Sequence, residues 1–204
     1  MQENGSSGSP TKAERTRARI LDIAQREASL IGIDSLTLGG LAQSCGLSKS
    51  GLNAHFGSKE ALQIAVIDAV AGRFRSEVAE PALAYQAGKK RLEAIMACWI
   101  AWSQHADRPG GCQFIAATFD FDGLDGRVRD RLEHWMTIWR GVIIRTVEEA
   151  NTAQALGHDP ENTASLAFGL YMAQHMERQL LGDDTAGDRA LGQWRERIAG
   201  QPQK

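Results

Sequence analysis

The amino-acid sequence predicts an all-α protein of about nine helices, and three observations lead to this prediction. Runs that alternate apolar and polar residues, which mark half-buried strands, are nearly absent. Apolar residues instead recur three and four positions apart along most of the chain. Residues that favour helix ends, chiefly Thr, Ser, Asp and Gly, stand at the borders of these periodic segments.

The first four predicted helices lie before residue 81. A capping box formed by Thr11 and Glu14 starts one that ends at Gly32, because glycine takes a left-handed conformation without penalty. The caps Thr37, Ser48 and Ser58 then start a second helix to residue 46, a third to residues 56–57, and a fourth that keeps its spacing until Pro81.

Beyond Pro81 the helices lengthen and carry most of the tryptophans. Their apolar spacing places them near residues 92–102, 112–121, 128–143, 160–181 and 185–198. Asp159 and Thr185 are expected to start the last two, with Pro160 at the first helical position. The aspartates of residues 120–125 are expected to cap the helix that follows them, so a boundary between a short-helix and a long-helix part falls near residue 80.

The overall composition fits a packed globular protein. Of the 204 residues, 43% are apolar and 24% charged, and the formal net charge is −2. Binding to nucleic acid would therefore need a local concentration of positive charge. Residues 1–10 are polar and rich in Gly and Ser, which indicates a disordered lead-in rather than a signal peptide.

Cysteine usage and hydropathy indicate a cytoplasmic protein without a membrane span. The three cysteines Cys45, Cys98 and Cys112 are far apart and form no CxxC pair, which argues against disulfides and a tetrahedral zinc site. No stretch approaches the roughly 20 apolar residues of a membrane helix.

Residues 38–52 are typical of a helix-turn-helix. Leu41, Ala42, Leu47 and Leu52 can face inward, and Gly46 stands where the chain turns sharply and needs a positive φ. Such a pair presents the second helix to a DNA major groove, which is about 12 Å wide. The alternative is two capped surface helices that bind no DNA.

The second of these helices carries small and polar side chains that suit close contact with base edges: Ser48, Lys49, Ser50, Gly51, Asn53 and His55. Asparagine can bond adenine through two hydrogen bonds, and lysine can reach guanine or phosphate. Lys59, at the start of the fourth helix, suits a phosphate. A basic segment with Lys12, Arg15, Arg17 and Arg19 could lie along the DNA backbone.

These residues resemble the N-terminal domain of TetR/AcrR-type transcriptional regulators. The likeness rests on residues 19–22 (RILD), 32–37 (GIDSLT), 46–52 (GLSKSGL) and 55–62 (HFGSKEAL), and it extends without a gap from about residue 15 to 70. It implies a homodimeric helical repressor that leaves a palindromic double-stranded DNA operator when a small-molecule effector binds. It also implies that Thr37, Ser48, Lys49, Ser50, Gly51, Asn53, His55 and Lys59 contact DNA.

Two departures from the family pattern bear on operator choice. Asn53 stands where the family usually has an aromatic residue, and Gly39 and Gly40 stand where a charged or polar residue is common. With the resemblance, the chain divides into a lead-in (1–10), a helix-turn-helix DNA-binding domain (11–57), a connecting helix (58–80) and an effector-binding and dimerisation domain (81–200).

Aromatic residues of the C-terminal part are candidates for an effector pocket, although aromatics at helical spacing also form plain core. The candidates are Trp99, Trp102, Phe114, Trp135, Trp139, Tyr171, Met172 and His175. The helices of residues 160–181 and 185–199 could pair with a second subunit through Leu166, Leu170, Leu180, Leu191 and Trp194, or these residues could pack within one subunit.

No metal, cofactor or enzymatic activity is expected. The aspartates of residues 120–125 lack the spacing of a calcium loop, because glycine is fourth rather than sixth and the twelfth residue is Arg131. No nucleophile–base signature or phosphate-cradling glycine loop is present. Two other functions compete with regulated DNA binding: a helical ligand-binding or catalytic bundle, and a DNA binder without sequence preference.

Overall fold

The computed structural model describes residues 10–199, and within this range it contains helices and no strands. The expected lead-in therefore lies outside the described residues, apart from Pro10. The helices are α1 (Lys12–Ile31), α2 (Leu38–Cys45), α3 (Lys49–Phe56), α4 (Lys59–Phe74), the π-helical η1 (Arg75–Ala79), α5 (Glu80–Leu83), α6 (Lys89–Ser103), α7 (Gln113–Phe121), α8 (Arg127–Gln154), α9 (Pro160–Leu181) and α10 (Ala186–Ile198). Because α4, η1 and α5 form one continuous helix, the described residues contain nine separate helices. The all-α prediction is confirmed.

Most of the predicted helix starts are observed. The side chains of Thr11, Thr37, Ser48, Ser58 and Asp159 each accept a hydrogen bond from the amide three residues later. Thr185 is the N-cap residue of α10, so the predicted start of this helix is confirmed, although the Thr185 side chain makes no capping hydrogen bond and its hydroxyl donates to Asp183 at 2.7 Å. The predicted cap of α8 is wrong. No side chain caps α8, whose N-cap residue is Gly126, with φ 127° and ψ 175°.

The connecting helix does not end at Pro81 as the sequence predicts, but continues to Leu83. Proline lacks an N–H, and its ring clashes with the carbonyl group four residues earlier in a regular α-helix. Here the preceding segment, Arg75–Ala79, is a π-helical turn in which the Glu80 N–H bonds to the Arg75 carbonyl oxygen. The wider turn carries the chain past the proline.

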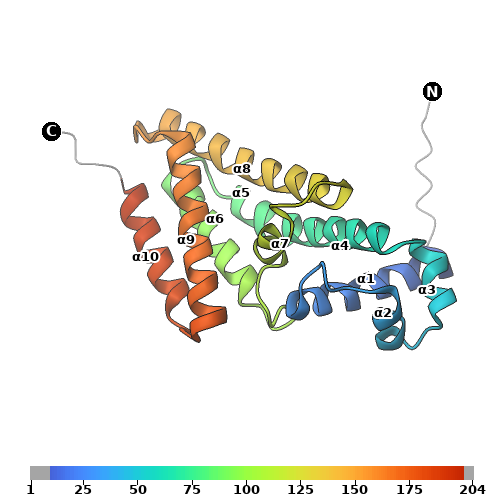
Figure 1. Ribbon diagram of the computed structural model, residues 1–204. Helices are drawn as coiled ribbons and strands as arrows, with labels where there is room; N and C mark the ends of the chain where they lie inside the picture. Colours follow the sequence, from blue (N-terminus) through green and yellow to red (C-terminus); the bar gives the residue numbers. More distant parts are fainter. Residues whose placement is uncertain (1–9, 200–204) are drawn as a thin grey trace, which may run out of the picture.

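The helices form two parts joined by α4: a head made of α1, α2 and α3, and a body made of α6 to α10 (Figure 1). At one end α1, α2 and α3 gather in blue and cyan, and at the other α9 and α10 lie side by side in orange and red. Between them α4 packs along α8. Buried apolar side chains run from Ile20 in the head to Ile198 in the body as one cluster.

The apolar face of α10 packs inside the subunit. Trp194 is fully buried, and its indole N–H donates to the Leu92 carbonyl oxygen of α6 at 2.7 Å. Leu191 is half-buried against the same core. The alternative of packing within one subunit therefore holds for α10, whereas Leu166 and Leu180 on α9 remain exposed.

The head docks on the body through the loop between α6 and α7. A Cβ atom on Gly110 would lie 1.5 Å from the Ser29 carbonyl oxygen of α1, so only glycine permits this approach. Nearby, the buried Gln113 side chain donates to the Gln25 carbonyl oxygen at 3.1 Å. The end of α1 and the start of α7 are thus held together by backbone contact and a buried hydrogen bond.

We expect Gly110→Ala to lower the free energy of unfolding by about 1–3 kcal/mol, because the new methyl group forces this contact apart. Gly72→Ala is the matched control, since Gly72 is an exposed residue of α4 and nothing lies within 4 Å of its Cβ position. That control should gain about 0.5–1 kcal/mol from lower chain entropy. Urea titration measures both, and equal stability of the two variants would contradict the close contact.

Candidate functional site

The α2–α3 pair has the geometry of a helix-turn-helix. Gly46 ends α2 in the left-handed conformation, with φ 67° and ψ 33°. The next amide, that of Leu47, donates back to the Ala42 carbonyl oxygen at 2.9 Å. Leu41 and Leu52 are buried between the helices and the rest of the head. This packing leaves the opposite side of α3 free to face outward.

The outward side of α3 is polar and its side chains are small. Ser48, Lys49, Ser50 and Asn53 are exposed, while Gly51 and His55 are half-buried. The Ser48 hydroxyl accepts from the Gly51 amide at 3.0 Å and lies 3.1 Å from the Ser50 hydroxyl. The first turn of α3 is therefore fixed, with hydroxyls and a lysine at its tip.

Two further predicted DNA contacts lie beside this face. Thr37 is exposed and caps α2 through a 3.1 Å bond from the Gly40 amide. The Lys59 ammonium group at the start of α4 pairs with the Asp34 carboxylate at 3.3 Å, and both side chains are about half exposed. An exposed pair of this kind contributes about 0–1 kcal/mol, so a phosphate could replace the carboxylate.

The Arg17 side chain packs against α3, although the sequence places it in a basic segment that could lie along the DNA backbone. Its guanidinium group lies 4.3 Å from the centre of the Phe56 ring and donates to the His55 carbonyl oxygen. It therefore braces the C-terminal end of α3 from α1. Lys12, Arg15 and Arg19 remain exposed.

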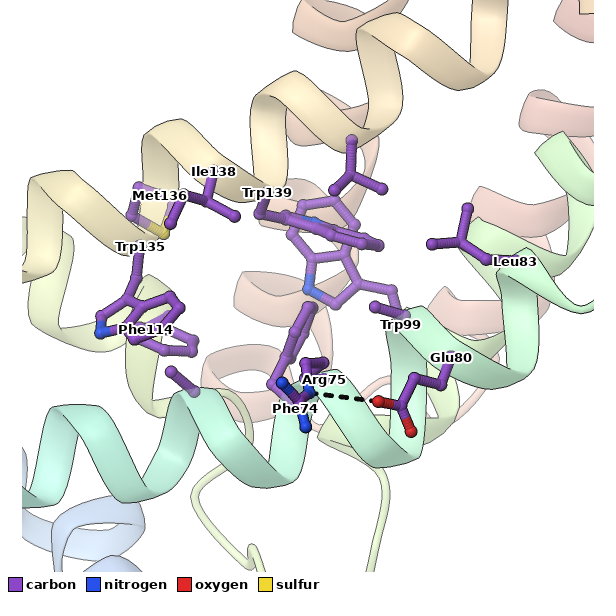
Figure 2. Close-up of a pocket in the computed structure, with 13 residues that line it drawn as sticks. Phe74, Arg75, Glu80, Leu83, Trp99, Phe114, Trp135, Met136, Ile138 and Trp139 are labelled. Carbon is purple, nitrogen blue, oxygen red and sulfur yellow. Dashed lines mark ion pairs between the residues drawn. The ribbon is translucent and has the colours of Figure 1, made fainter. Parts of the chain in front are cut away.

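A cavity of about 290 Å³ lies in the body, between the continuous α4–η1–α5 helix and α8 (Figure 2). Four of the predicted pocket residues line it: Trp99, Phe114, Trp135 and Trp139. Sequence reasoning missed the residues from the connecting helix and several aliphatic neighbours: Ala71, Phe74, Arg75, Ala79, Glu80, Leu83, Met136, Ile138 and Val142. Their only signal was helical spacing, which indicates burial but not what the residue lies against.

The other four predicted pocket residues lie outside this cavity. Trp102 is buried beneath the Arg108 guanidinium group, at 3.6 Å. Tyr171 stacks on Trp99 at 4.0 Å between ring centres, and Met172 lines a separate surface groove between α8 and α9. His175 lies against Gly111, where burial lowers the pKa of its imidazole.

Phe74 is the centre of the aromatic cluster. It packs edge to face against Trp99, Trp102, Phe114 and Trp139, with ring centres 4.9–6.3 Å apart. These partners come from α6, α7 and α8, whereas Phe74 is the last residue of α4. The C-terminal end of α4 is therefore fixed by four rings, three of which also line the cavity: Trp99, Phe114 and Trp139.

An ionic network connects the π-helical turn to the head. Glu77, in η1, accepts from the buried Arg108 side chain at 2.7 Å and from Arg73 at 3.1 Å. Arg73 also lies 3.7 Å from the Asp22 carboxylate of α1 and 3.8 Å from that of Asp107. One short segment thus lines the cavity with Arg75 and Ala79 and is linked to the head indirectly, because Glu77 pairs with Arg73 and Arg73 lies beside Asp22.

The network lowers the pKa of Glu77. Burial by itself would raise the pKa of this carboxyl, but the hydrogen bonds and charges of Arg108 and Arg73 outweigh that effect and hold the pKa below its ordinary value. The glutamate is therefore ionised at neutral pH, which suits its pairing with a buried arginine.

Two kinds of feature are absent from residues 10–199. No group of three or more His, Cys, Asp or Glu side chains gathers as metal ligands would. None of the described helices has the length and apolarity that crossing a membrane requires.

Family models and solved structures match the chain. The model for bacterial regulatory proteins of the tetR family matches residues 20–66, and that for the tetracyclin repressor-like C-terminal domain matches residues 88–198. No curated protein matches.

Three solved structures illustrate the similarity. A TetR transcriptional regulator from Chloroflexus aurantiacus has a TM-score of 0.84 at 22% identity, covering 93% of this chain and 97% of that chain. A TetR-family regulator from Cytophaga hutchinsonii has a TM-score of 0.81 at 19% identity, covering 97% and 100%. AibR, in complex with isovaleryl coenzyme A and operator DNA, has a TM-score of 0.70 at 20% identity, covering 87% and 97%. Identities this low show a shared fold.

We expect Glu77→Gln to lower the free energy of unfolding by about 1–3 kcal/mol at pH 7, because buried Arg108 loses its charged partner. A carboxyl with a lowered pKa stabilises the folded state above its unfolded pKa, and this stabilisation is lost as the pH falls through the folded pKa. The difference between wild type and variant should therefore close as the pH falls below 4.5, the ordinary value. Denaturant titrations at several pH values measure it.

Glu133→Gln is the control for this experiment, because Glu133 is exposed and pairs with Arg129, four residues earlier on the same helix. It should change the free energy of unfolding little at any pH. A Glu77→Gln deficit that stays constant down to pH 3 would show that the charge of Glu77 is not what stabilises the network.

Proposed function

The chain belongs to the TetR family and is a non-enzymatic, DNA-binding transcriptional regulator, and we propose that it is a repressor released from a palindromic operator by a small molecule. One observation carries this proposal. A single continuous helix, α4–η1–α5, begins beside the outward face of α3 and ends in the wall of an aromatic cavity.

We propose that α3 enters the major groove with its N-terminal turn foremost. Lys49 and Asn53 are exposed one helical turn apart, so both can reach base edges, and the Ser48 and Ser50 hydroxyls can bond either bases or phosphates. Gly51 lies between Lys49 and Asn53 and, having no side chain, allows the helix to approach the bases closely. His55 lies at the C-terminal end of the helix. Thr37 and Lys59 flank the groove and suit phosphates.

The operator-bound form is proposed to be a homodimer. Two copies of α3 one DNA turn apart, roughly 34–36 Å, read more bases than one and match a palindrome. On α9, exposed small or apolar residues recur three or four positions apart and form one stripe: Ser165, Gly169, Ala173, Met176 and Leu180. Beside this stripe runs the groove between α8 and α9, and a partner's helices could fill both.

The cavity is proposed as the effector site. AibR, which has the same fold, is known with both isovaleryl coenzyme A and operator DNA, and this supports a ligand-responsive function here. An effector must bind one conformation more tightly than the other in order to shift the population away from DNA. Because η1 is shared by the cavity and the ionic network, a movement of the turn would reach α1. We place the protein in the cytoplasm, where operator DNA lies.

A mobility-shift experiment with the intergenic DNA upstream of the protein's own gene tests the regulatory function. A discrete shift that survives competing random DNA supports it. No shift with any promoter fragment at low salt would instead favour a helical ligand-binding protein without regulated DNA binding.

Replacing Lys59 with Ala should weaken binding to operator and random DNA alike, because a phosphate contact carries no sequence information. The slope of log affinity against log salt should become shallower by about one unit. Lys90→Ala, at an exposed position in the first turn of α6, is the matched control. An unchanged slope would remove Lys59 from the phosphate contacts.

Met176→Glu should convert the dimer to a monomer, because it places two like charges in a buried apolar contact related by symmetry. Sedimentation measures the mass, and operator affinity should fall at least about tenfold, the equivalent of 1.4 kcal/mol. Gln193→Glu, exposed on α10, should remain dimeric. A dimeric Met176→Glu protein would place the subunit contact elsewhere.

A further inference from the structure

The cavity has walls of one chemical kind. Aromatic rings from α4, α6, α7 and α8 surround it, and aliphatic side chains such as Leu83, Ile138 and Val142 fill the gaps between them. Figure 2 shows Phe74, Trp99 and Trp139 grouped at the centre, with Trp135 and Phe114 to one side and Leu83 to the other. The part of a molecule that enters the cavity would meet mostly carbon atoms, whereas Leu83 and Ile138, 38% and 41% exposed, lie where the cavity opens to solvent.

The two charged residues of the lining cancel each other. Arg75 and Glu80 lie on the connecting helix and pair at 3.1 Å, as the dashed line in Figure 2 marks. Their side chains are 77% and 59% exposed, which places them at the rim rather than inside. An anion approaching the rim therefore meets Glu80 as well as Arg75, and a cation meets Arg75 as well as Glu80.

Hydrogen-bonding capacity inside the cavity is limited to indole N–H groups. The Trp135 indole already donates to Asp68 at 2.9 Å. The indole nitrogens of Trp99 and Trp139 are buried and have no hydrogen-bond partner in the described part of the chain. The side chains of the inner wall thus offer two spare donors and no acceptor, so a ligand with several polar groups would leave most of them unsatisfied.

From this wall chemistry we infer that the effector is a small, uncharged, largely apolar molecule. A cavity of about 290 Å³ lies at the lower end of the usual range for ligand sites, which suits one or two rings or a hydrocarbon of similar size. The molecule carries at most one or two hydrogen-bond acceptors, which a turn of the Trp99 or Trp139 ring could meet. This inference rests on the proposed function and narrows its ligand to a chemical class that excludes coenzyme A thioesters, which carry several phosphate charges.

Three naphthalene probes of the same ring size test the inference: 2-acetylnaphthalene is neutral with one acceptor, 2-ethylnaphthalene is neutral without one, and 2-naphthoate is an anion. The readout is the set of indole N–H resonances of the five tryptophans in a ¹⁵N–¹H spectrum. Both neutral probes should shift the Trp99 and Trp139 signals, and the ketone should shift at least one of them further downfield. Trp194 is an internal control, because its N–H is bonded to the Leu92 carbonyl oxygen.

The anion should bind at least tenfold more weakly than the ketone. Equal or tighter binding of 2-naphthoate, or of isovaleryl coenzyme A at the same tryptophans, would overturn the inference. So would neutral probes that leave Trp99 and Trp139 unmoved at saturation of their solubility.

Two matched variants locate the binding. Val142→Phe adds a ring to the cavity wall and should abolish the shifts, whereas Met172→Phe adds the same ring to the surface groove and should leave them unchanged. If Val142→Phe does not fold, the wild-type spectra with the three probes decide the matter alone. Shifts that survive in a folded Val142→Phe protein would place the probes elsewhere.

The mobility-shift experiment, run without any probe, distinguishes a wrong ligand class from a wrong regulatory function. Specific DNA binding together with absent probe binding would overturn the ligand class and leave the regulatory function intact. Probe binding together with absent DNA binding would overturn the regulatory function and leave the ligand class intact.

Discussion

The position of Phe74 is the constraint on which the rest of the structure depends. This ring ends α4 and packs edge to face on four other rings, from α6, α7 and α8. Edge-to-face contacts have preferred geometries, so a cluster of this kind resists gradual sliding and favours discrete arrangements. The outward face of α3 lies at the other end of the same helix. Any repacking around Phe74 must therefore be absorbed in the π-helical turn or transmitted along α4.

The ionic network favours transmission. Arg108 is 2% exposed and has its guanidinium group between the Trp102 ring and Glu77, so its charge is costly to leave without a partner. Glu77 lies in the π-helical turn and also contacts Arg73, which approaches α1 through Asp22. The turn thus lines the cavity with Arg75 and Ala79, and it is linked to the head through the successive ion pairs Glu77–Arg73 and Arg73–Asp22. π-helical turns inside α-helices are frequent at functional sites, and this one lies between the two proposed sites.

Local features of the structure followed from the sequence, whereas the partners of buried side chains did not. Thr37 and Ser48 could be predicted as caps because the hydrogen bond that makes a cap is formed within four residues. Gly46 could be predicted because a left-handed turn selects glycine. Trp194 could not be assigned to the subunit interior or to a partner, since helical spacing gives the buried face and not its neighbour. For the same reason the sequence could not distinguish Trp99 and Trp139, which line the cavity, from Tyr171 and Met172, which do not. The predicted helix end at Pro81 was wrong because the penalty for proline applies to a regular α-helix, whereas here a π-helical turn carries the chain past the proline.

The Lys59–Asp34 pair bears on how quickly such a protein could find one sequence in a genome. Affinity for random DNA comes from cations that meet phosphates, and every cation already paired with a carboxylate contributes less to it. Lys59 lies 3.3 Å from Asp34, so in the free protein part of its charge is neutralised beside the outward face of α3. A protein with a formal net charge of −2 and a partly masked lysine at this edge would stay bound to non-cognate DNA for a shorter time. Because the exposed pair contributes only about 0–1 kcal/mol, a phosphate of any DNA sequence could displace the carboxylate, and Asp34 would then lower the affinity for operator and random DNA by the same small amount.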